Sequence, residues 1–432
     1  MIMAMIRPET EMKYSGLAWE KFVPIEWNKC RLKDYFEFEK GKNAQIYTKD
    51  YIGLHKGSFP VYSGQTENDG VMGEIDTYDY ELDECLFSTT VGAKVMTPKV
   101  LSGKFSLSQN CLIMRKIRKC VIRFVYYTLF PLFDYERAKI PAYMQPSLRI
   151  EDLKTYNLYM PLYTEQKKIA DYLDKTCLKI EEIIAEAKAS IDEYKELKQS
   201  VIFEAVTKGL DKNAEMKDSG YDFIGCIPSE WEMCKVRHLG TAQNGISIGG
   251  DAFGSGHPFV SYGDVYKNYS LPKTVDKLVQ SSEEDRKRYS VKKGDWFFTR
   301  TSETIEEVGF SCVCEETIPD AVFAGFLIRV RPFNNRIYTG FAKYYFRSNH
   351  LRTFFVKEMN LVTRASLAQG LLKDAPVVVP PYDEQIEIAN YLENKCEIID
   401  GIIKDKESTI NDLEAYKKSL IYEVVTGKRR VV

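Results

Sequence analysis

Apolar residues recur every three or four positions in two long stretches of the chain. The first stripe consists of Leu173, Cys177, Ile180, Ile184, Ala187, Ile191, Tyr194, Leu197 and Val201, and the second of Leu392, Cys396, Ile399, Ile403, Ile410, Leu413, Tyr416 and Leu420. This spacing predicts two amphipathic helices of the coiled-coil kind. A helix of about 45 residues is roughly 65 Å long and needs a partner along its length. We therefore predict that the two helices pack against each other through Leu173, Ile180, Ile184, Ile191, Leu392, Ile399, Ile403 and Ile410.

The two stretches are copies of one segment, because residues 163–207 align with 382–426 without an insertion or deletion. A second pair of matching segments opens each copy: Ser15-Gly16, Pro24 and Glu26-Trp27 recur as Ser219-Gly220, Pro228 and Glu230-Trp231. Between these ends the similarity is faint but ordered; 86–89 resembles 296–299, 112–113 resembles 327–328, and 147–148 resembles 366–367. An internal repeat of this kind predicts a pseudo-twofold axis and antiparallel helices.

The divergent middle of each copy contains short β-rich runs separated by turns, which indicates mixed α/β domains. The predicted fold class is α+β and multidomain: two mixed α/β domains separated by two long helices that form an antiparallel coiled coil. The predicted boundaries are an N-terminal extension at 1–13, a first domain at 14–160, a helical spacer at 161–213, a second domain at 214–380 and a second spacer at 381–432. Met12 could serve as a start, so the first dozen residues carry little weight in this prediction.

Composition excludes several classes of protein. Of the 432 residues 44% are hydrophobic and 28% are charged, with a net charge of −2, as in ordinary soluble proteins. No stretch has the length of a membrane span, and residues 1–7 lack the basic start of a signal peptide. The ten cysteines form no regular framework and the four histidines have no zinc spacing. The sequence therefore predicts a reduced cytoplasmic protein with no metal site and no membrane partner.

The charges are unevenly distributed. Segments 85–133 and 321–357 contain no Asp or Glu but carry eight and seven basic residues, while 161–209 carries 10 acidic and 8 basic residues. Two basic runs at equivalent repeat positions suit a polyanion, because Lys and Arg neutralise phosphates. The interpretation predicts a basic surface on each variable domain, offset by the more acidic helices.

Polar residues in predicted turns are the candidate readers of bases, since side chains on loops can reach base edges. In the first copy we single out Ser63, Gln65, Thr66 and Asn68, with Lys94, Lys104 and Arg115 for charge. In the second copy we single out Ser261, Tyr262, Thr299, Arg300 and Thr301, with Arg329 and Arg331 for charge.

Two motifs resemble methyltransferase signatures but are incomplete. The segment 379–382, Val-Pro-Pro-Tyr, has valine where the catalytic motif needs an Asn or Asp side-chain oxygen. We expect it to lead into the second long helix instead. The segment 251–256 resembles a glycine-rich cofactor loop, but no buried apolar strand precedes it. We expect a plain turn there, and no catalytic apparatus in the chain.

The whole layout resembles the specificity subunits of type I restriction-modification systems, the HsdS family. The resemblance covers the chain from about Met12 onward. It is carried by the paired helix starts at 165–173 and 384–392, the opening at 217–232, and the segments 258–265, 294–301 and 108–113. The first copy's opening, 18–23, departs further from the family pattern. Within family-typical loop motifs lie Gln109, Asn110, Gln145 and Ser147 in the first copy, and Arg364, Ser366 and Gln369 in the second.

The resemblance implies a non-catalytic subunit that reads a bipartite, gapped site in double-stranded DNA. Each variable domain would be a target recognition domain for one half-site, and the coiled coil would set their separation. The same resemblance implies docking of two modification subunits, which bind S-adenosylmethionine and methylate adenine, and two restriction subunits can join. The chain itself would bind no cofactor. Two alternatives stay open: a self-sufficient DNA methyltransferase and a structural coiled-coil adaptor.

Overall fold

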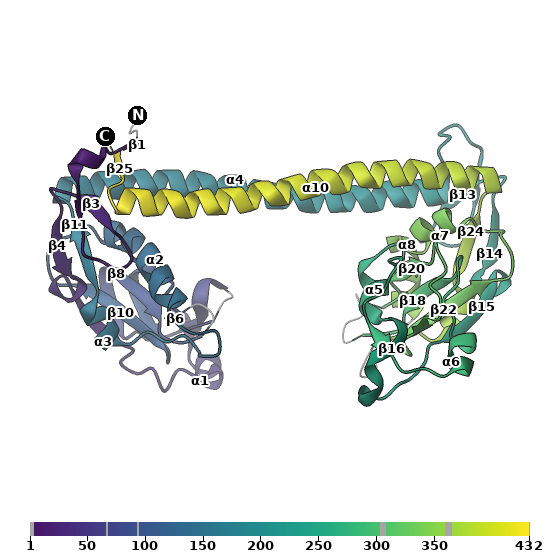
Figure 1. The fold of residues 1–432 in the computed structure, drawn as a ribbon, viewed down its shortest axis with the longest axis horizontal. Coiled ribbons are helices and arrows are strands. Elements are labelled where there is room, and N and C mark those ends of the chain that lie inside the picture. Colours follow the sequence, from purple (N-terminus) through teal and green to yellow (C-terminus); the bar gives the residue numbers. More distant parts are fainter. Residues whose placement is uncertain (1–3, 66–67, 93–94, 303–307, 359–364, 432) are drawn as a thin grey trace. The chain divides into compact units, whose positions relative to one another are not determined.

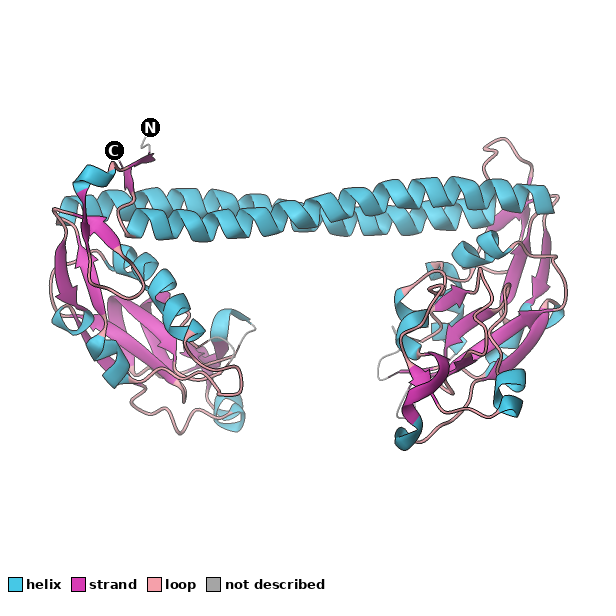
Figure 2. Cartoon of the chain, viewed as in Figure 1, coloured by secondary structure: helices cyan, strands magenta, loops and turns pink. Residues whose placement is uncertain are grey.

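The computed structural model describes residues 4–65, 68–92, 95–302, 308–358 and 365–431. Its contacts divide the chain into two units. Unit 1 consists of Met1–Ala187 and Glu407–Val432, and unit 2 of Lys188–Lys406. Each unit combines one mixed domain of strands and helices with one end of each long helix (Figures 1 and 2).

Unit 1 is built around one sheet. Its strands are β1 (Ala4–Ile6), β2 (Met12–Tyr14), β3 (Phe22–Pro24), β4 (Asn28–Arg31), β5 (Phe36–Lys40), β6 (Lys56–Tyr62), β7 (Val71–Ile75), β8 (Tyr80–Thr89), β9 (Lys99–Leu107), β10 (Cys111–Lys116), β11 (Asn157–Met160) and β25 (Arg429–Val431). Its helices are α1 (Lys49–Leu54), α2 (Ile122–Ala138), α3 (Ile150–Thr155) and parts of α4 (Tyr163–Lys208) and α10 (Tyr382–Val425). Six strands pair in the order β5-β10-β8-β9-β6-β7, and only β6 and β9 pair in parallel.

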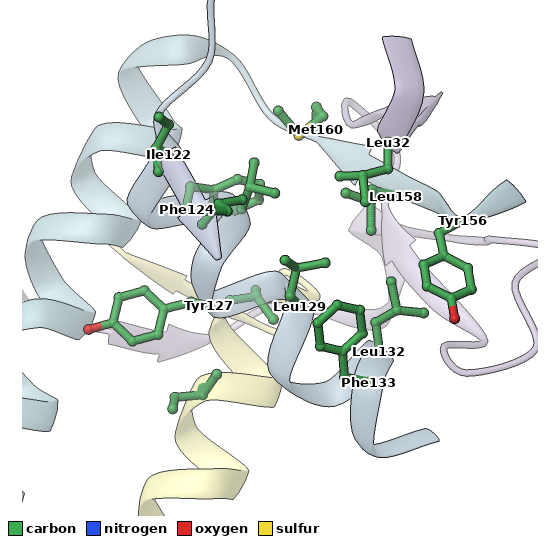
Figure 3. Close-up of a cluster of buried hydrophobic side chains, with 14 of the residues drawn as sticks. Leu32, Ile122, Phe124, Tyr127, Leu129, Leu132, Phe133, Tyr156, Leu158 and Met160 are labelled. Atoms are coloured by element: carbon green, nitrogen blue, oxygen red, sulfur yellow. The ribbon is translucent and has the colours of Figure 1, made fainter. Parts of the chain in front are cut away.

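The core of unit 1 lies where α2 packs beside the strands and the long helices (Figure 3). Phe124, Leu129 and Phe133 of α2 are buried together with Leu158 of β11. Fully burying an aromatic or aliphatic side chain contributes about 1.5–3 kcal/mol. Trp27 is also buried in this cluster.

Unit 2 repeats this plan with a divided sheet. Its strands are β12 (Met216–Asp218), β13 (Cys226–Pro228), β14 (Glu232–Lys235), β15 (Gly240–Asn244), β16 (Phe253–Val260), β17 (Leu278–Val279), β18 (Trp296–Thr299), β19 (Thr301–Ser302), β20 (Ser311–Val313), β21 (Val322–Phe323), β22 (Leu327–Pro332), β23 (Ala365–Ser366) and β24 (Pro376–Val379). Its helices are α5 (Tyr262–Lys267), α6 (Glu283–Arg288), α7 (Thr339–Tyr345), α8 (Asn349–Glu358), α9 (Gln369–Asp374) and the remaining parts of α4 and α10. The sheet β15-β22-β18-β20 corresponds to β5-β10-β8-β9, and the parallel pair of β16 with β21 corresponds to β6 with β9.

The two long helices pack antiparallel within each unit. In unit 1 the early residues Leu173 and Ile180 of α4 share a core with the late residues of α10, while in unit 2 Leu392 and Ile399 of α10 are buried near the end of α4. Ile191 and Ile410 are buried as well, and Ile184 and Ile403 are half-buried. The eight residues predicted to pack therefore face inward, as expected of a coiled-coil seam. Leu197 and Tyr416 of the predicted stripes are exposed instead, so the prediction is wrong at these two positions.

Two ion pairs occur at equivalent positions of the repeat in these helices. Lys417 of α10 pairs with Glu181 of α4 in unit 1. In unit 2 Lys198 of α4 lies 2.7 Å from Asp400 of α10. The repeat alignment places Glu181 at Asp400 and Lys198 at Lys417, so the same antiparallel register recurs in both units.

Each long helix is fastened to its domain by two repeated contacts. The side-chain amides of Gln166 and Gln385 donate to a carbonyl five residues earlier and accept, respectively, from the backbone N–H of Val121 at 2.9 Å and of Tyr338 at 2.7 Å. Eight residues further on, just over two turns, a carboxylate accepts from a buried tyrosine hydroxyl at 2.7 Å, in the pairs Tyr127–Asp174 and Tyr344–Glu393. The two glutamine amides are buried and have their hydrogen-bond partners satisfied, and such groups hold a rigid geometry, so each domain has a defined orientation on its own helix end.

Unit 1 contains a junction between the two ends of the described chain. Strand β1 pairs antiparallel with β25, and the side chain of Arg7 is only 2% exposed. The guanidinium lies 2.6 Å from Glu26 and 3.3 Å from Glu165, and donates to the carbonyl of Gly427 at 3.0 Å. The N-terminal segment is thus an integral part of unit 1, in contrast to the little weight the sequence interpretation gave it.

The two openings differ for a physical reason. In unit 2 the indole N–H of Trp231 donates to Glu384 at 2.8 Å, and burial raises the pKa of that carboxyl. In unit 1 the equivalent carboxylate, Glu165, interacts with Trp27 as well and in addition lies 3.3 Å from the guanidinium of Arg7. The departure of the first opening from the repeat pattern therefore coincides with the junction of the chain ends.

We predict an acid-sensitive stability in unit 2 because of His350. Burial lowers the pKa of His350 to about 3, and its Nδ1 lies 2.6 Å from the Ser348 hydroxyl. An unfolded histidine titrates near about 6.5. Below that pH the unfolded chain takes up a proton that the folded chain does not, so stability falls as the pH drops from about 6.5 toward 3.

The expected loss from this group is about 2 kcal/mol between pH 6.5 and 5. The measurement is the free energy of unfolding in urea at both pH values, for the wild-type chain and for H350Q. The difference between the two pH values should shrink in H350Q and stay unchanged in H238Q, whose imidazole is exposed. An equal pH difference in all three chains would contradict the assignment.

Candidate nucleic-acid interface

Four segments of unit 1 meet at one end of its sheet. The backbone N–H of Thr90 donates to the carbonyl of Asn110 at 2.7 Å, and the carbonyl of Thr90 accepts from the N–H of Leu148 at 2.8 Å. Val91 and Ser147 form a neighbouring antiparallel bridge. We call the segments 41–45, 89–91, 108–110 and 147–148 loop frame 1.

Four segments of unit 2 make the same backbone connections. The N–H of Arg300 donates to the carbonyl of Phe326 at 2.9 Å, and the carbonyl of Arg300 accepts from the N–H of Leu367 at 2.7 Å. Thr301 pairs antiparallel with Ser366. We call the segments 245–249, 299–301, 324–326 and 366–367 loop frame 2.

A glycine closes each frame by a close backbone approach. A Cβ on Gly41 would lie 2.5 Å from the carbonyl oxygen of Leu107, and one on Gly245 would lie 2.1 Å from that of Ala324. Only glycine fits such positions without moving the neighbouring strand. The equivalence of the two frames thus extends to the residue that permits their geometry.

The side chains on the two equivalent frames differ. Thr90 stands where unit 2 has Arg300, Gln109 where it has Gly325, and Asn110 where it has Phe326. The strand register also corrects the sequence alignment by one residue, because Leu112 pairs with β5 as Ile328 pairs with β15. The backbone is therefore shared, while the exposed chemistry of the two units is not.

Several sequence-predicted residues lie in these frames. In loop frame 1 Gln109, Asn110 and Ser147 are exposed. In loop frame 2 Arg300 and Thr301 are half-buried and Ser366 is exposed, while Thr299 is buried in β18 and its hydroxyl accepts from the N–H of Phe310 at 2.9 Å. Gln369 adjoins the frame and donates to the side chain of Asn244 at 2.8 Å.

Other candidates lie on the segment that follows the parallel strand of each unit. Ser63 is buried, Gln65 donates to the carbonyl of Val71 at 2.5 Å, and Asn68 donates to the same carbonyl at 3.2 Å. These bonds hold the turn in shape. In unit 2 the corresponding strand β16 ends at Val260. Ser261 is buried and caps α5, and Tyr262 begins that helix.

The charged candidates are engaged within the fold. Lys104 lies 3.7 Å from Glu81, and Arg115 pairs with Glu37 and Glu39. Arg331 lies 2.6 Å from Asp295, which is buried. Arg329 donates to the carbonyl of Ser290 at 2.6 Å, and burial, with the nearby Arg331, lowers its pKa to about 10.

Some charges of the two acid-free runs meet acids from distant parts of the same unit, as in the pairs Lys99–Asp69 and Arg336–Glu232. Arg347 is half-buried against backbone carbonyls, including that of Val265 at 3.1 Å. Lys116, Arg118 and Lys119 of the first run are exposed. A run of like charges along the chain therefore does not by itself define a basic patch in space.

Four of the sequence candidates lie outside the loop frames or outside the described residues. Gln145 is exposed and comes two residues before the segment 147–148 of loop frame 1. Thr66, Lys94 and Arg364 lie outside the described residues. Residues of the loop 42–45 and Phe326 were not among the sequence candidates. The available signal was Gly41 and Gly245, each of which opens a loop at an equivalent repeat position. The sequence alone, however, does not show that these loops lie beside 108–110 and 324–326.

The two methyltransferase-like motifs have structural explanations. Val379 is buried in β24, and the two prolines after it precede the start of α10 at Tyr382, as predicted. The segment 251–256 is a 3-10 turn followed by the beginning of β16, so the predicted plain turn is only partly right. Among the described residues no helix is long and apolar enough to cross a membrane.

Comparison with known proteins identifies the family of this chain. The sequence matches the family described as type I restriction modification DNA specificity domain over residues 24–193 and again over 228–412. The chain therefore belongs to this family. The two matched regions correspond to the two copies of the internal repeat.

Individual relatives of this chain are named as type I specificity subunits. The type I restriction enzyme MpnII specificity subunit of Mycoplasma pneumoniae is 31% identical over 160 residues, covering 35% of this chain and 46% of that protein. The putative type I restriction enzyme MjaX specificity subunit of Methanocaldococcus jannaschii is 22% identical over 452 residues, covering 95% of each. The alignments with the first M. pneumoniae relatives span 38–60% of those proteins.

A solved structure shares the fold. A chain from work on complex assembly and conformational transition of the type I R-M system superposes with a TM-score of 0.70 at 14% identity. The superposition covers 94% of this chain and 99% of that chain. At this identity the likeness establishes the fold alone.

Proposed function

We propose that this chain is the DNA specificity subunit of a type I restriction-modification complex, and that each unit reads one half of a bipartite, gapped site in double-stranded DNA. The observation that carries the proposal is the pair of loop frames, which share backbone connections and a closing glycine but present different side chains. Equivalent scaffolds with different exposed chemistry suit two readers of different half-sites. The family membership supports the same function.

The partners follow from the family and the repeat. Two equivalent helix ends offer two equivalent docking surfaces, which suits two modification subunits; two restriction subunits can then join the complex. The modification subunits would bind S-adenosylmethionine and methylate adenine. This chain would determine which DNA sequence the complex recognises and would contribute no catalytic group or cofactor, in agreement with the usual role of specificity subunits.

The two alternatives have less support. A self-sufficient methyltransferase needs a side-chain oxygen at position 379, where a buried valine pairs in β24. A structural adaptor would have no use for two domains that keep one loop frame and vary its side chains. Micromolar binding of S-adenosylmethionine by the purified full chain would support the methyltransferase, and its absence would support the non-catalytic role.

The test of the proposed function is co-expression of the full chain with a type I modification subunit, followed by base-resolution mapping of methyladenine. We expect one gapped motif, lost when the chain is omitted. Methylation that persists without the chain would contradict the proposal, as would a complex that forms but methylates no defined motif.

A further inference from the structure

We propose that the two loop frames read their half-sites by different chemistry: side-chain amides of Gln45 and Gln109 recognise adenine in the half-site of unit 1, and Arg300 with Phe326 recognises guanine and thymine in the half-site of unit 2. This inference rests on the proposed function and assigns the residues that determine specificity. Its evidence is the placement, exposure and partners of these side chains.

Loop frame 1 surrounds a hollow of about 720 Å³. The loop 42–46 lines one part of the hollow, and residues 108–111 with Thr90 line another. Gln45, Gln109 and Asn110 are exposed there, and Asn110 has a positive φ of 64°. No side-chain hydrogen bond joins Gln45 or Gln109 to another of the residues that the structure describes.

Hydrogen bonds to one residue, Asp79, hold the loop that carries Gln45. Asp79 accepts from Asn43 at 2.6 Å and from the hydroxyl of Tyr47 at 2.8 Å, and its carbonyl accepts from Lys42 at 3.0 Å. Gln45 stands between these anchors. A held loop with a free amide keeps its donor and acceptor available, and an amide can bond both N6 and N7 of adenine in the major groove.

Loop frame 2 presents a cation and an aromatic ring. Within the described part of the chain, no ion pair or side-chain hydrogen bond engages the guanidinium of Arg300, unlike those of Arg329, Arg331 and Arg347. Its backbone is fixed on both sides by the bonds to Phe326 and Leu367. A guanidinium held in this way can bond O6 and N7 of guanine together.

Phe326 is 63% exposed and belongs to no buried cluster of unit 2. Its backbone pairs directly with Arg300, so the ring and the guanidinium share one small surface. Burying such a side chain against an apolar partner on DNA is favourable, because it removes apolar surface from water. The major groove offers one such partner next to a guanine, the methyl group of thymine.

The experiment uses the full chain co-expressed with the modification subunit, and maps methyladenine at base resolution for Q45A, Q109A, R300A and F326A. We expect Q45A and Q109A to relax the base preference in one half of the motif, and R300A and F326A to relax it only in the other half. One good contact corresponds to a preference of tenfold or more. Thermal unfolding of each variant checks that the fold is kept.

A conservative substitution separates base reading from charge. R300K keeps the cation but loses the planar fork, so it should keep DNA binding and lose the preference for guanine. K287A, which removes an exposed lysine of α6, is the matched control and should leave the motif unchanged. An unchanged motif in both R300A and R300K, or a change in the same half for Q109A and F326A, would overturn the inference. A wild-type chain that yields no motif would instead count against the proposed function.

Discussion

Replacing Arg7 with alanine is expected to destabilise unit 1 by about 3 kcal/mol. Removing one member of a buried ion pair typically costs about 3–5 kcal/mol, because the remaining charge is left buried without its partner. The low end applies here, because Glu11 and Glu26 keep much of their solvent contact while Glu165 keeps less. The bond to the carbonyl of Gly427 is lost as well.

The measurement is urea unfolding of the full chain together with amide hydrogen exchange of β1 and β25. R7A should lower the midpoint for unit 1 and raise exchange in both strands, and deletion of residues 1–11 should do the same. R430A is the matched control, because Arg430 is an exposed arginine on β25 that lies 3.9 Å from Glu11. If R7A and R430A behave alike, the buried junction does not stabilise unit 1.

The second large effect is expected from Gly245→Ala. The new Cβ would lie 2.1 Å from the carbonyl oxygen of Ala324 and 2.3 Å from that of Phe323, and backbone oxygens cannot move away without breaking the strand. Ile246 would then lose its bond to Phe323. Overpacking of this kind costs about 1–3 kcal/mol, and it displaces the loop that closes loop frame 2.

The consequence should be specific to one half-site. We expect G245A to reduce methylation of the wild-type motif at least tenfold, or to relax the motif in the half read by unit 2. G41A, the equivalent change in unit 1, should affect the other half. G401A is the control, because Gly401 lies in α10, outside loop frame 2, and a Cβ there meets nothing within 4 Å. Equal motifs for G245A and G401A would show that the frame does not read DNA.

The helices and the repeat could be predicted from the sequence because they depend on local periodicity. Leu173, Ile180, Leu392 and Ile399 report a seam by their spacing alone, and the structure buries all four. The two-copy organisation followed from the alignment of the two helix segments without insertion or deletion. Such features need no knowledge of which distant segments meet.

The binding surface could not be predicted in the same way, because it depends on contacts between distant segments. Arg329 and Arg331 looked like surface charges in an acid-free run, yet Arg331 pairs with Asp295, which is 36 positions away. Thr299 looked like a turn residue but is buried in β18. Conversely, nothing in the sequence singles out Phe326, and only the strand register places it at the position of Asn110.

The proposed function requires that each domain reads its own half-site independently. The most direct measurement replaces residues 14–160 with the corresponding domain of another specificity subunit and maps methyladenine at base resolution with the same modification subunit. We expect one half of the motif to change while the other half stays the same. A motif that changes in both halves, or in neither, would contradict it.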